Sequence, residues 1–169
     1  MAQTYTRPDF RLTPTPEGDD VAFWTGGEDD RLMVHRCRSC EQYFHPPAPA
    51  CFRCRSRDVA SEPVSGRGRV ATFTVNRQPW LPTLPPPYVI VLVELEEQPD
   101  VRIFSQLVDV DPAEVRIGDE VEVFFEHWAP EGGTEVEFSA PLMYQRLNMI
   151  EGIESGITRF TFNKEKNRC

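Results

Sequence analysis

Four cysteines in two closely spaced pairs are the residues of this sequence best suited to chemistry. Cys37 and Cys40 are separated by two residues, as are Cys51 and Cys54, and ten residues lie between the pairs. Each pair lets two thiolates on one tight turn point at a common centre, and two such turns complete a tetrahedron around Zn²⁺. Because four cysteines leave no position for water or substrate, we expect a structural zinc ion. A mononuclear iron site would fit the same spacing, although zinc is favoured.

Arginine is concentrated around these cysteines. Residues 36–77 contain eight arginines and three acidic residues, in a chain whose net charge is −9. Two interpretations stay open, because the arginines either balance the thiolate charge or bind an anion. For phosphate we favour Arg67 and Arg69 on a glycine-containing turn. With four cysteines available, His35 and His45 are expected to be surface or packing residues and not ligands.

No catalytic set is recognisable in the sequence. There is no nucleophile elbow, no phosphate-binding glycine loop and no zinc-hydrolase helix. Four carboxylates crowd one strand end and are interpreted as a solvated charge cluster: Glu94, Glu96, Glu97 and Asp100. His127 stands alone at the end of another predicted strand. We therefore expect the chain by itself not to be catalytic.

The loop from Pro79 to Pro87 carries apolar side chains where polar ones are usual. These side chains are Trp80, Leu81 and Leu84, on a proline-stiffened frame. Such a loop loses little entropy on docking, which predicts a partner-binding surface. Folding of the same side chains over an open end of a barrel is an equally open interpretation.

The rest of the pattern predicts a mainly β chain, because 16 prolines interrupt any long helix. After residue 68 the hydrophobic period becomes two, and five strands are expected at residues 70–75, 88–95, 101–108, 120–126 and 135–144. Together they predict a five-stranded antiparallel OB-fold barrel, with a short helical turn within residues 109–119. Residues 89–93 are apolar on both faces and predict a central strand that is covered on both sides.

Composition divides the chain into four segments. Residues 1–30 are expected to form an N-terminal arm with a short helix at 21–24, residues 31–64 the zinc ribbon, and residues 65–146 the barrel. Residues 147–169 contain both lysines and three of the four asparagines. We interpret them as a C-terminal extension that could be non-native, and we do not assign Cys169 to the metal.

Charge and hydropathy argue against several classes of protein. Nucleic-acid binding depends on Lys and Arg that neutralise phosphates, so the acidic balance makes it unlikely to be the function. No stretch approaches the ~18 apolar residues of a bilayer span, and Met1–Asp20 lacks the layout of a signal peptide. We expect a cytoplasmic protein without a membrane partner. In that reducing compartment, paired cysteines are more often metal ligands than disulfides.

The order of motifs resembles the DUF35 family, acyl-CoA-associated proteins with a rubredoxin-like zinc ribbon and an OB-fold. The resemblance covers roughly residues 21–144. The motifs that carry it are Phe23-Trp24, the two cysteine pairs with Pro46-Pro47 between them, Ser65-Gly66-Arg67-Gly68-Arg69-Val70, Pro87-Tyr88-Val89-Ile90 and Val115-Arg116-Ile117-Gly118-Asp119-Glu120-Val121. One departure is the turn at residues 96–100, which lacks the glycine usual there.

The resemblance implies a companion subunit of a thiolase-like or lipid-transfer-type enzyme, with acyl-CoA as the shared substrate. In similar proteins the active-site cysteine and histidine belong to the partner. The favoured subtype is the aldolase that cleaves steroid side-chain acyl-CoA, because the heavy use of Arg, Pro and Val is typical of high-GC bacteria. The alternative is a single-strand nucleic-acid binder. Such a protein needs interleaved basic and aromatic residues on the barrel face, and this barrel offers little besides Arg102 and Phe104. An electron-transfer protein would need iron.

Overall fold

The computed structural model describes residues 16–80, 84–128 and 138–147, and the side chains up to Glu126. The described chain begins with three short helical elements: η1 (Gly18–Asp20), α1 (Val21–Thr25) and η2 (Gly26–Asp29). The helical turn predicted at residues 21–24 is thus confirmed. Acidic residues precede α1, where they suit the positive end of a helix, and Phe23 is its buried residue. Among the described residues, no helix is long and apolar enough to cross a bilayer.

A small three-stranded sheet follows and carries the cysteines. It contains β1 (Leu32–Cys37), β2 (Tyr43–Phe44) and β3 (Val59–Val64), in the order β2-β1-β3 with antiparallel neighbours. Its own core is very small, because the buried cluster consists of Cys37, Phe44 and Cys51. A module of this size buries too little apolar surface to fold unaided, so the cysteine site must contribute to its stability.

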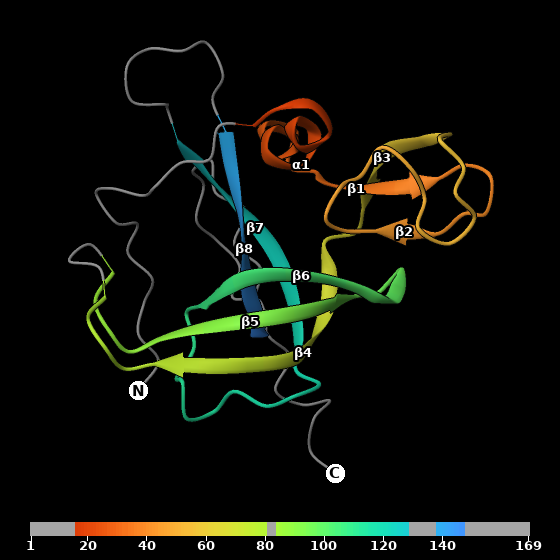
Figure 1. The fold of residues 1–169 in the computed structure, drawn as a ribbon. Helices are drawn as coiled ribbons and strands as arrows, with labels where there is room; N and C mark the ends of the chain where they lie inside the picture. The colour runs from red at the N-terminus through yellow and green to blue at the C-terminus, as the bar shows by residue number, and fades with distance from the viewer. Residues whose placement is uncertain (1–15, 81–83, 129–137, 148–169) are drawn as a thin grey trace.

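The second sheet is a closed barrel of five strands (Figure 1). Its strands are β4 (Arg67–Asn76), β5 (Tyr88–Leu95), β6 (Gln98–Val108), β7 (Glu120–Trp128) and β8 (Phe138–Leu147), in the order β4-β5-β6-β8-β7, with β7 paired to β4. All neighbours are antiparallel except β6 and β8, which run parallel. The expectation of purely antiparallel pairing needs this correction, since an odd number of strands cannot alternate in direction around a closed ring.

Strand positions agree with the prediction better than strand ends do. Strands β4 and β6 each begin three residues earlier than expected, and β8 is displaced towards the C-terminus relative to residues 135–144. Glycine, proline and charged residues at these ends obscure the alternating pattern. Residues 109–119 form turns and no helical turn, with the Glu114 N–H donating to the Asp111 carbonyl at 2.9 Å.

Strand β5 is central, between β4 and β6, but only one of its faces is fully buried. Val89, Val91 and Val93 point into the barrel and are at most 1% exposed. Ile90 and Leu92 alternate with them and are half-buried. The prediction of cover on both faces is therefore wrong for the described residues. A barrel has a single interior, and the opposite face of each strand forms its outer surface.

The zinc ribbon and the barrel share one hydrophobic core. Phe23 of α1 and Leu32 and Val34 of β1 belong to the same buried cluster as the valines of the barrel. Two further hydrogen bonds join the sheets, because the Gln98 side chain accepts from the Tyr43 N–H at 3.0 Å and donates to the Tyr43 carbonyl at 3.2 Å. The cysteine site is thereby fixed to the barrel and not only tethered to it.

Candidate metal centre

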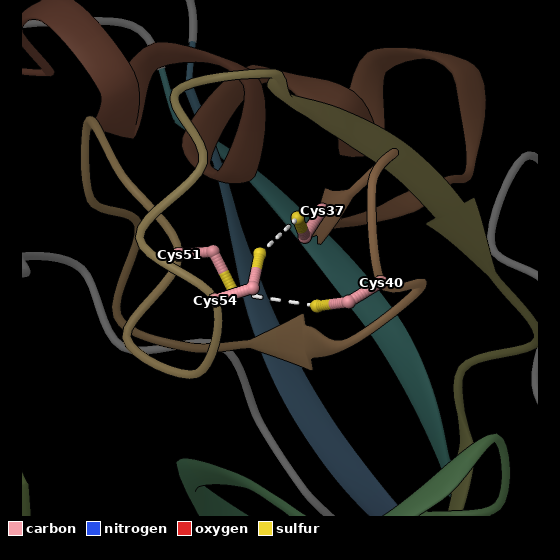
Figure 2. Close-up of side chains that lie close together, drawn as sticks. All are labelled: Cys37, Cys40, Cys51 and Cys54. Carbon is pink, nitrogen blue, oxygen red and sulfur yellow. Dashed lines mark hydrogen bonds between the residues drawn. The ribbon is translucent and has the colours of Figure 1, made fainter.

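The four cysteines converge on one point between two turns of the zinc ribbon (Figure 2). Their sulfur atoms all lie within 4.8 Å of one another. The Sγ atoms of Cys37 and Cys54 are 3.5 Å apart, and those of Cys40 and Cys51 are 3.6 Å apart. Sulfurs bound tetrahedrally at about 2.3 Å from zinc are just under 4 Å apart, so the arrangement fits the ion closely.

The two cysteine turns have the same backbone structure. The Glu41 N–H donates to the Cys37 carbonyl at 2.8 Å, and the Arg55 N–H donates to the Cys51 carbonyl at 2.9 Å. Glu41 and Arg55 both have positive φ angles, 61° and 62°. This left-handed residue reverses the chain directly after the second cysteine of each pair and so keeps both sulfurs on one side of the turn. The C-x2-C spacing therefore acts locally, before any long-range contact.

The thiols influence one another's ionisation. Burial opposes ionisation of Cys37, but backbone N–H groups of Cys40 and Ser39 and neighbouring thiols more than offset it and lower its pKa to about 7. For Cys40 a backbone N–H of Gln42 favours the thiolate, yet burial and the other three cysteines raise its pKa to about 12. The repulsion that raises the pKa of Cys40 would be relieved by a bound cation, and Zn²⁺ is the ion that this donor set prefers.

Both histidines near the cysteines pack against aromatic rings, as predicted. His35 is buried, lies 5.5 Å from the Phe44 ring and accepts a hydrogen bond from the Ala48 N–H at 3.3 Å. His45 stacks at 4.5 Å on Phe23 of the N-terminal helix. The donor set contains neither of them, so the centre consists of four cysteines. The side chain of His127 lies outside the described residues.

Arg67 and Arg69 lie on the outside of β4 and line a pocket of about 210 Å³. Each already has a carboxylate partner. Arg67 Nε lies 3.9 Å from Glu96 Oε2, and Arg69 Nη2 donates to Glu120 Oε1 at 2.6 Å. An anion in this pocket would therefore share or replace these carboxylates. The remaining lining residues are Gly68, Glu94, Leu95, Pro99 and Val121.

Three carboxylates of the predicted cluster take part in hydrogen bonds, an ion pair or the turn between two strands. Glu94 accepts from Arg102 at 2.6 Å, and Glu97 accepts from the Ser65 N–H at 2.6 Å. Glu96 and Glu97 also form the two-residue connection between β5 and β6, where Leu95 pairs with Gln98. The turn closes without a glycine because neither glutamate needs a positive φ, and an irregularity in the ladder follows Glu94.

Trp80 does not close the barrel. Its side chain is 71% exposed, and its indole N–H donates to Asn76 Oδ1 at 2.8 Å. Leu84 is half-buried, and Leu81 lies outside the described residues. For Trp80 the interpretation as a barrel plug is therefore wrong.

Two family models cover most of the described chain. Residues 24–60 match the model described as "ChsH2, rubredoxin-like zinc ribbon domain", and residues 61–126 match "ChsH2, C-terminal OB-fold domain". A DUF35 domain-containing scaffold protein of Methanothermobacter thermautotrophicus is 38% identical over 103 residues, which cover 60% of this chain and 76% of the relative. The chain belongs to the DUF35 family. The zinc ribbon and the OB-fold predicted from the sequence are confirmed.

Other relatives of this chain are named as subunits of acyl-CoA enzymes. The 3-oxo-4,17-pregnadiene-20-carboxyl-CoA hydratase alpha subunit of Mycobacterium tuberculosis is 38% identical over 111 residues, 66% of this chain and 35% of the relative. The benzoylsuccinyl-CoA thiolase subunit BbsA of Thauera aromatica is 32% identical over 99 residues, 57% of this chain and 65% of BbsA. The chain spans about a third of the length of the hydratase subunits that it matches.

A solved structure shares the fold over nearly its whole chain. A chain of the "Ltp2-ChsH2(DUF35) aldolase" has a TM-score of 0.66 and 31% sequence identity to this protein, and the match covers 79% of this chain and 98% of that one.

Two features of the site could not be found from the sequence. They are the Gln98–Tyr43 hydrogen bonds and the carboxylate partners of Arg67 and Arg69. The partners are 55 residues apart for Tyr43 and Gln98, 51 for Arg69 and Glu120, and 29 for Arg67 and Glu96 (96 − 67), so no local pattern indicates them. Arg67 and Arg69 lie in β4 and not on the predicted turn, and they face outward because they alternate with the buried Gly68 and Val70.

Proposed function

We propose that this chain is the non-catalytic companion subunit of a thiolase-superfamily enzyme acting on acyl-CoA. The favoured subtype is the thiolase-like aldolase of steroid side-chain degradation, which performs retro-aldol carbon–carbon cleavage. The observation that carries the proposal is the match to 98% of a chain in the Ltp2-ChsH2(DUF35) aldolase. The thiolase and hydratase subunits among the relatives support the same class of substrate.

The zinc ion in this proposal is structural and held by Cys37, Cys40, Cys51 and Cys54. Bound zinc would fix the two cysteine turns and stabilise the zinc ribbon, and it would leave no coordination position for a substrate. Thiolate ligation also suits a reducing compartment, so a cytoplasmic location is part of the proposal.

Catalysis is assigned to the partner because neither His35 nor His45 is placed as the base of a nucleophile. His35 accepts a hydrogen bond from the backbone N–H of Ala48, and the buried Nδ1 of His45 accepts none. The cysteines Cys37, Cys40, Cys51 and Cys54 belong to the proposed metal site. A cysteine or serine paired with either of these histidines, as nucleophilic catalysis would need, is therefore not part of the proposal.

The acyl-CoA and the partner are proposed to meet this chain at two places. The pocket beside Arg67 and Arg69 offers two guanidinium groups to phosphate. The loop with Trp80, Leu81 and Leu84 offers an exposed aromatic anchor to the partner protein. Nucleic-acid binding gains no support from the outer face of β5 and β6, where Arg102 is bound to Glu94 beside the exposed Phe104.

The test is reconstitution with the thiolase-like subunit encoded near this chain. The purified chain should not turn over an acyl-CoA, and activity should appear when the subunit is added. Co-purification of the two proteins should accompany it. Robust turnover by the chain alone, or failure to form any complex with that subunit, would overturn the proposal.

A further inference from the structure

The second cysteine turn carries an exposed basic surface with an aromatic ring at its centre. This second-turn surface consists of Phe52, Arg53, Arg55 and Arg57. Phe52 is 72% exposed, and its described ring contact is an edge contact with Phe44 at 6.2 Å. All three arginines are exposed. An exposed aromatic ring among arginines has the composition that is typical of the residues that dominate protein interfaces.

The arginines of this surface differ in their partners from Arg36 and Arg38 beside the first cysteine turn. Arg36 and Arg38 each lie within 3.9 Å of a carboxylate oxygen. Arg53 donates instead to the neutral Gln42 Oε1 at 3.1 Å. Arg55 and Arg57 have no ion pair with any described carboxylate. Within the described part of the chain, the positive charge of Arg55 and Arg57 is therefore not balanced by an ion pair.

The metal site does not cancel this charge. Four thiolates around Zn²⁺ carry a net charge of −2, against three arginines. Cys37 and Cys51 are buried, Cys40 is half-buried and Cys54 is exposed, so the sulfur charge only partly reaches the surface that the arginines form. In a chain of net charge −9, the second-turn surface is a local positive region.

We propose that the second-turn surface docks onto an acidic surface of the catalytic partner, with Phe52 as its apolar anchor. The inference rests on the proposed function. Arginine and aromatic residues are enriched among the residues that dominate binding, and charge complementarity fixes orientation and accelerates encounter. A coenzyme A phosphate is the less suitable occupant, because small anions are held by donors that converge on a concavity. The described pocket with arginines lies on the barrel.

The test compares charge reversal on this surface with charge reversal elsewhere. In the reconstituted complex, Arg55→Glu/Arg57→Glu should raise the dissociation constant roughly tenfold or more and reduce its dependence on salt. Phe52→Ala should also weaken binding. Arg31→Glu is the matched control, because Arg31 is exposed and has no ion pair with a described carboxylate. Glutamate is compatible with position 55, since Glu41 has the same φ in the first turn.

Zinc content equal to that of the wild type confirms that the variants are folded. If the double variant forms the complex as well as the wild type does, this inference is overturned and the proposed function still stands. So would a double variant that loses affinity for free coenzyme A, in a titration of the chain alone, while complex formation stays intact. Absence of any wild-type complex would instead overturn the proposed function, and this inference with it.

Discussion

At the scale of single residues, each cysteine pair is followed by a residue with φ near 60°, which reverses the chain and keeps both sulfurs on one side of the turn. Such a conformation costs roughly 1–2 kcal/mol for a residue other than glycine. Glu41 and Arg55 occupy it, and the hydrogen bonds from their N–H groups to the carbonyls of Cys37 and Cys51 stabilise the two turns. The raised pKa of Cys40, to which the other three cysteines contribute, is the kind of repulsion that a bound cation relieves.

The first prediction concerns the metal. Cys51→Ser should release zinc and unfold the zinc ribbon, because a module with so small a core depends on metal binding for stability. Metal analysis should give one zinc per wild-type chain and much less for the variant. Cys169→Ser, which changes a cysteine not assigned to the site, should leave the zinc content unchanged. Iron with a visible absorption band in protein from native cells would contradict the assignment.

A second prediction follows from His45, whose pKa is lowered to about 4 mainly by burial, with Asp20 opposing the shift. The unfolded chain takes up this proton near pH 6.5 and the folded chain only near pH 4. The stability that neutral His45 contributes is therefore complete above pH 6.5 and is lost as the pH falls towards 4.

Because His45 is partly exposed, we expect the effect to be about 2 kcal/mol. The free energy of unfolding, measured in urea between pH 7.5 and pH 4.5, should fall less for His45→Phe than for the wild type. Parallel pH profiles for the two proteins would show that His45 titrates normally.

At the scale of elements, the zinc ribbon and the barrel are joined by packing and by one side chain. Phe23, Leu32 and Val34 extend the barrel core to the helix and β1. Gln98, at the start of β6, pairs with both backbone groups of Tyr43 in β2. The hairpin between β5 and β6 thus determines where the metal site lies relative to the barrel.

Removal of this side chain should loosen the connection. Gln98→Ala loses two partly buried hydrogen bonds and should lower the free energy of unfolding by about 1–2 kcal/mol. Hydrogen exchange at the Tyr43 amide should accelerate. Gln78→Ala, at an exposed glutamine of the β4–β5 connection, is the control. Unchanged exchange at Tyr43 would mean that core packing alone holds the two sheets together.

At the scale of the whole molecule, surfaces suited to partners lie on both parts of the fold. The Trp80 loop leaves the barrel between β4 and β5, and the second cysteine turn belongs to the zinc ribbon, on the other side of the view in Figure 1. A companion subunit of this shape can contact a larger enzyme at more than one point, which stabilises the complex beyond either contact alone.

Trp80→Ala should weaken assembly by about 2 kcal/mol or more and leave the melting temperature of the isolated chain nearly unchanged. The reason is that the indole is 71% exposed and makes a hydrogen bond with the exposed end of Asn76. Phe104→Ala is the matched control, since Phe104 has the same exposed fraction on the outer face of β6. Equal losses of affinity from both variants would assign the interface to the barrel face instead.

The last prediction concerns the pocket. Arg67→Ala/Arg69→Ala should raise the apparent KM of the assembled enzyme for acyl-CoA several-fold and flatten its salt dependence, if the arginines bind phosphate. Arg102→Ala serves as control, because Arg102 is also exposed and paired with a carboxylate but does not line the pocket. An unchanged KM would mean that coenzyme A is bound entirely by the partner.

The sequence by itself determined the features that depend on neighbouring residues. The spacing of Cys37–Cys40 and Cys51–Cys54 predicted the metal site, because each turn forms locally. Alternation placed the barrel strands and identified Val89, Val91 and Val93 as apolar residues of a central strand. The family resemblance rested on the order of these same local motifs.

Only the tertiary structure decided which distant residues meet. Closure of the ring made β6 and β8 parallel and brought Glu120 to Arg69, and packing of the zinc ribbon on the barrel brought Gln98 to Tyr43. The tertiary structure also showed that Arg67 and Arg69 have carboxylate partners, whereas Arg55 and Arg57 have no ion pair with a described carboxylate. Charge in a sequence shows how many arginines are present. Whether an arginine is available to a ligand depends on contacts across tens of residues, which only folding creates.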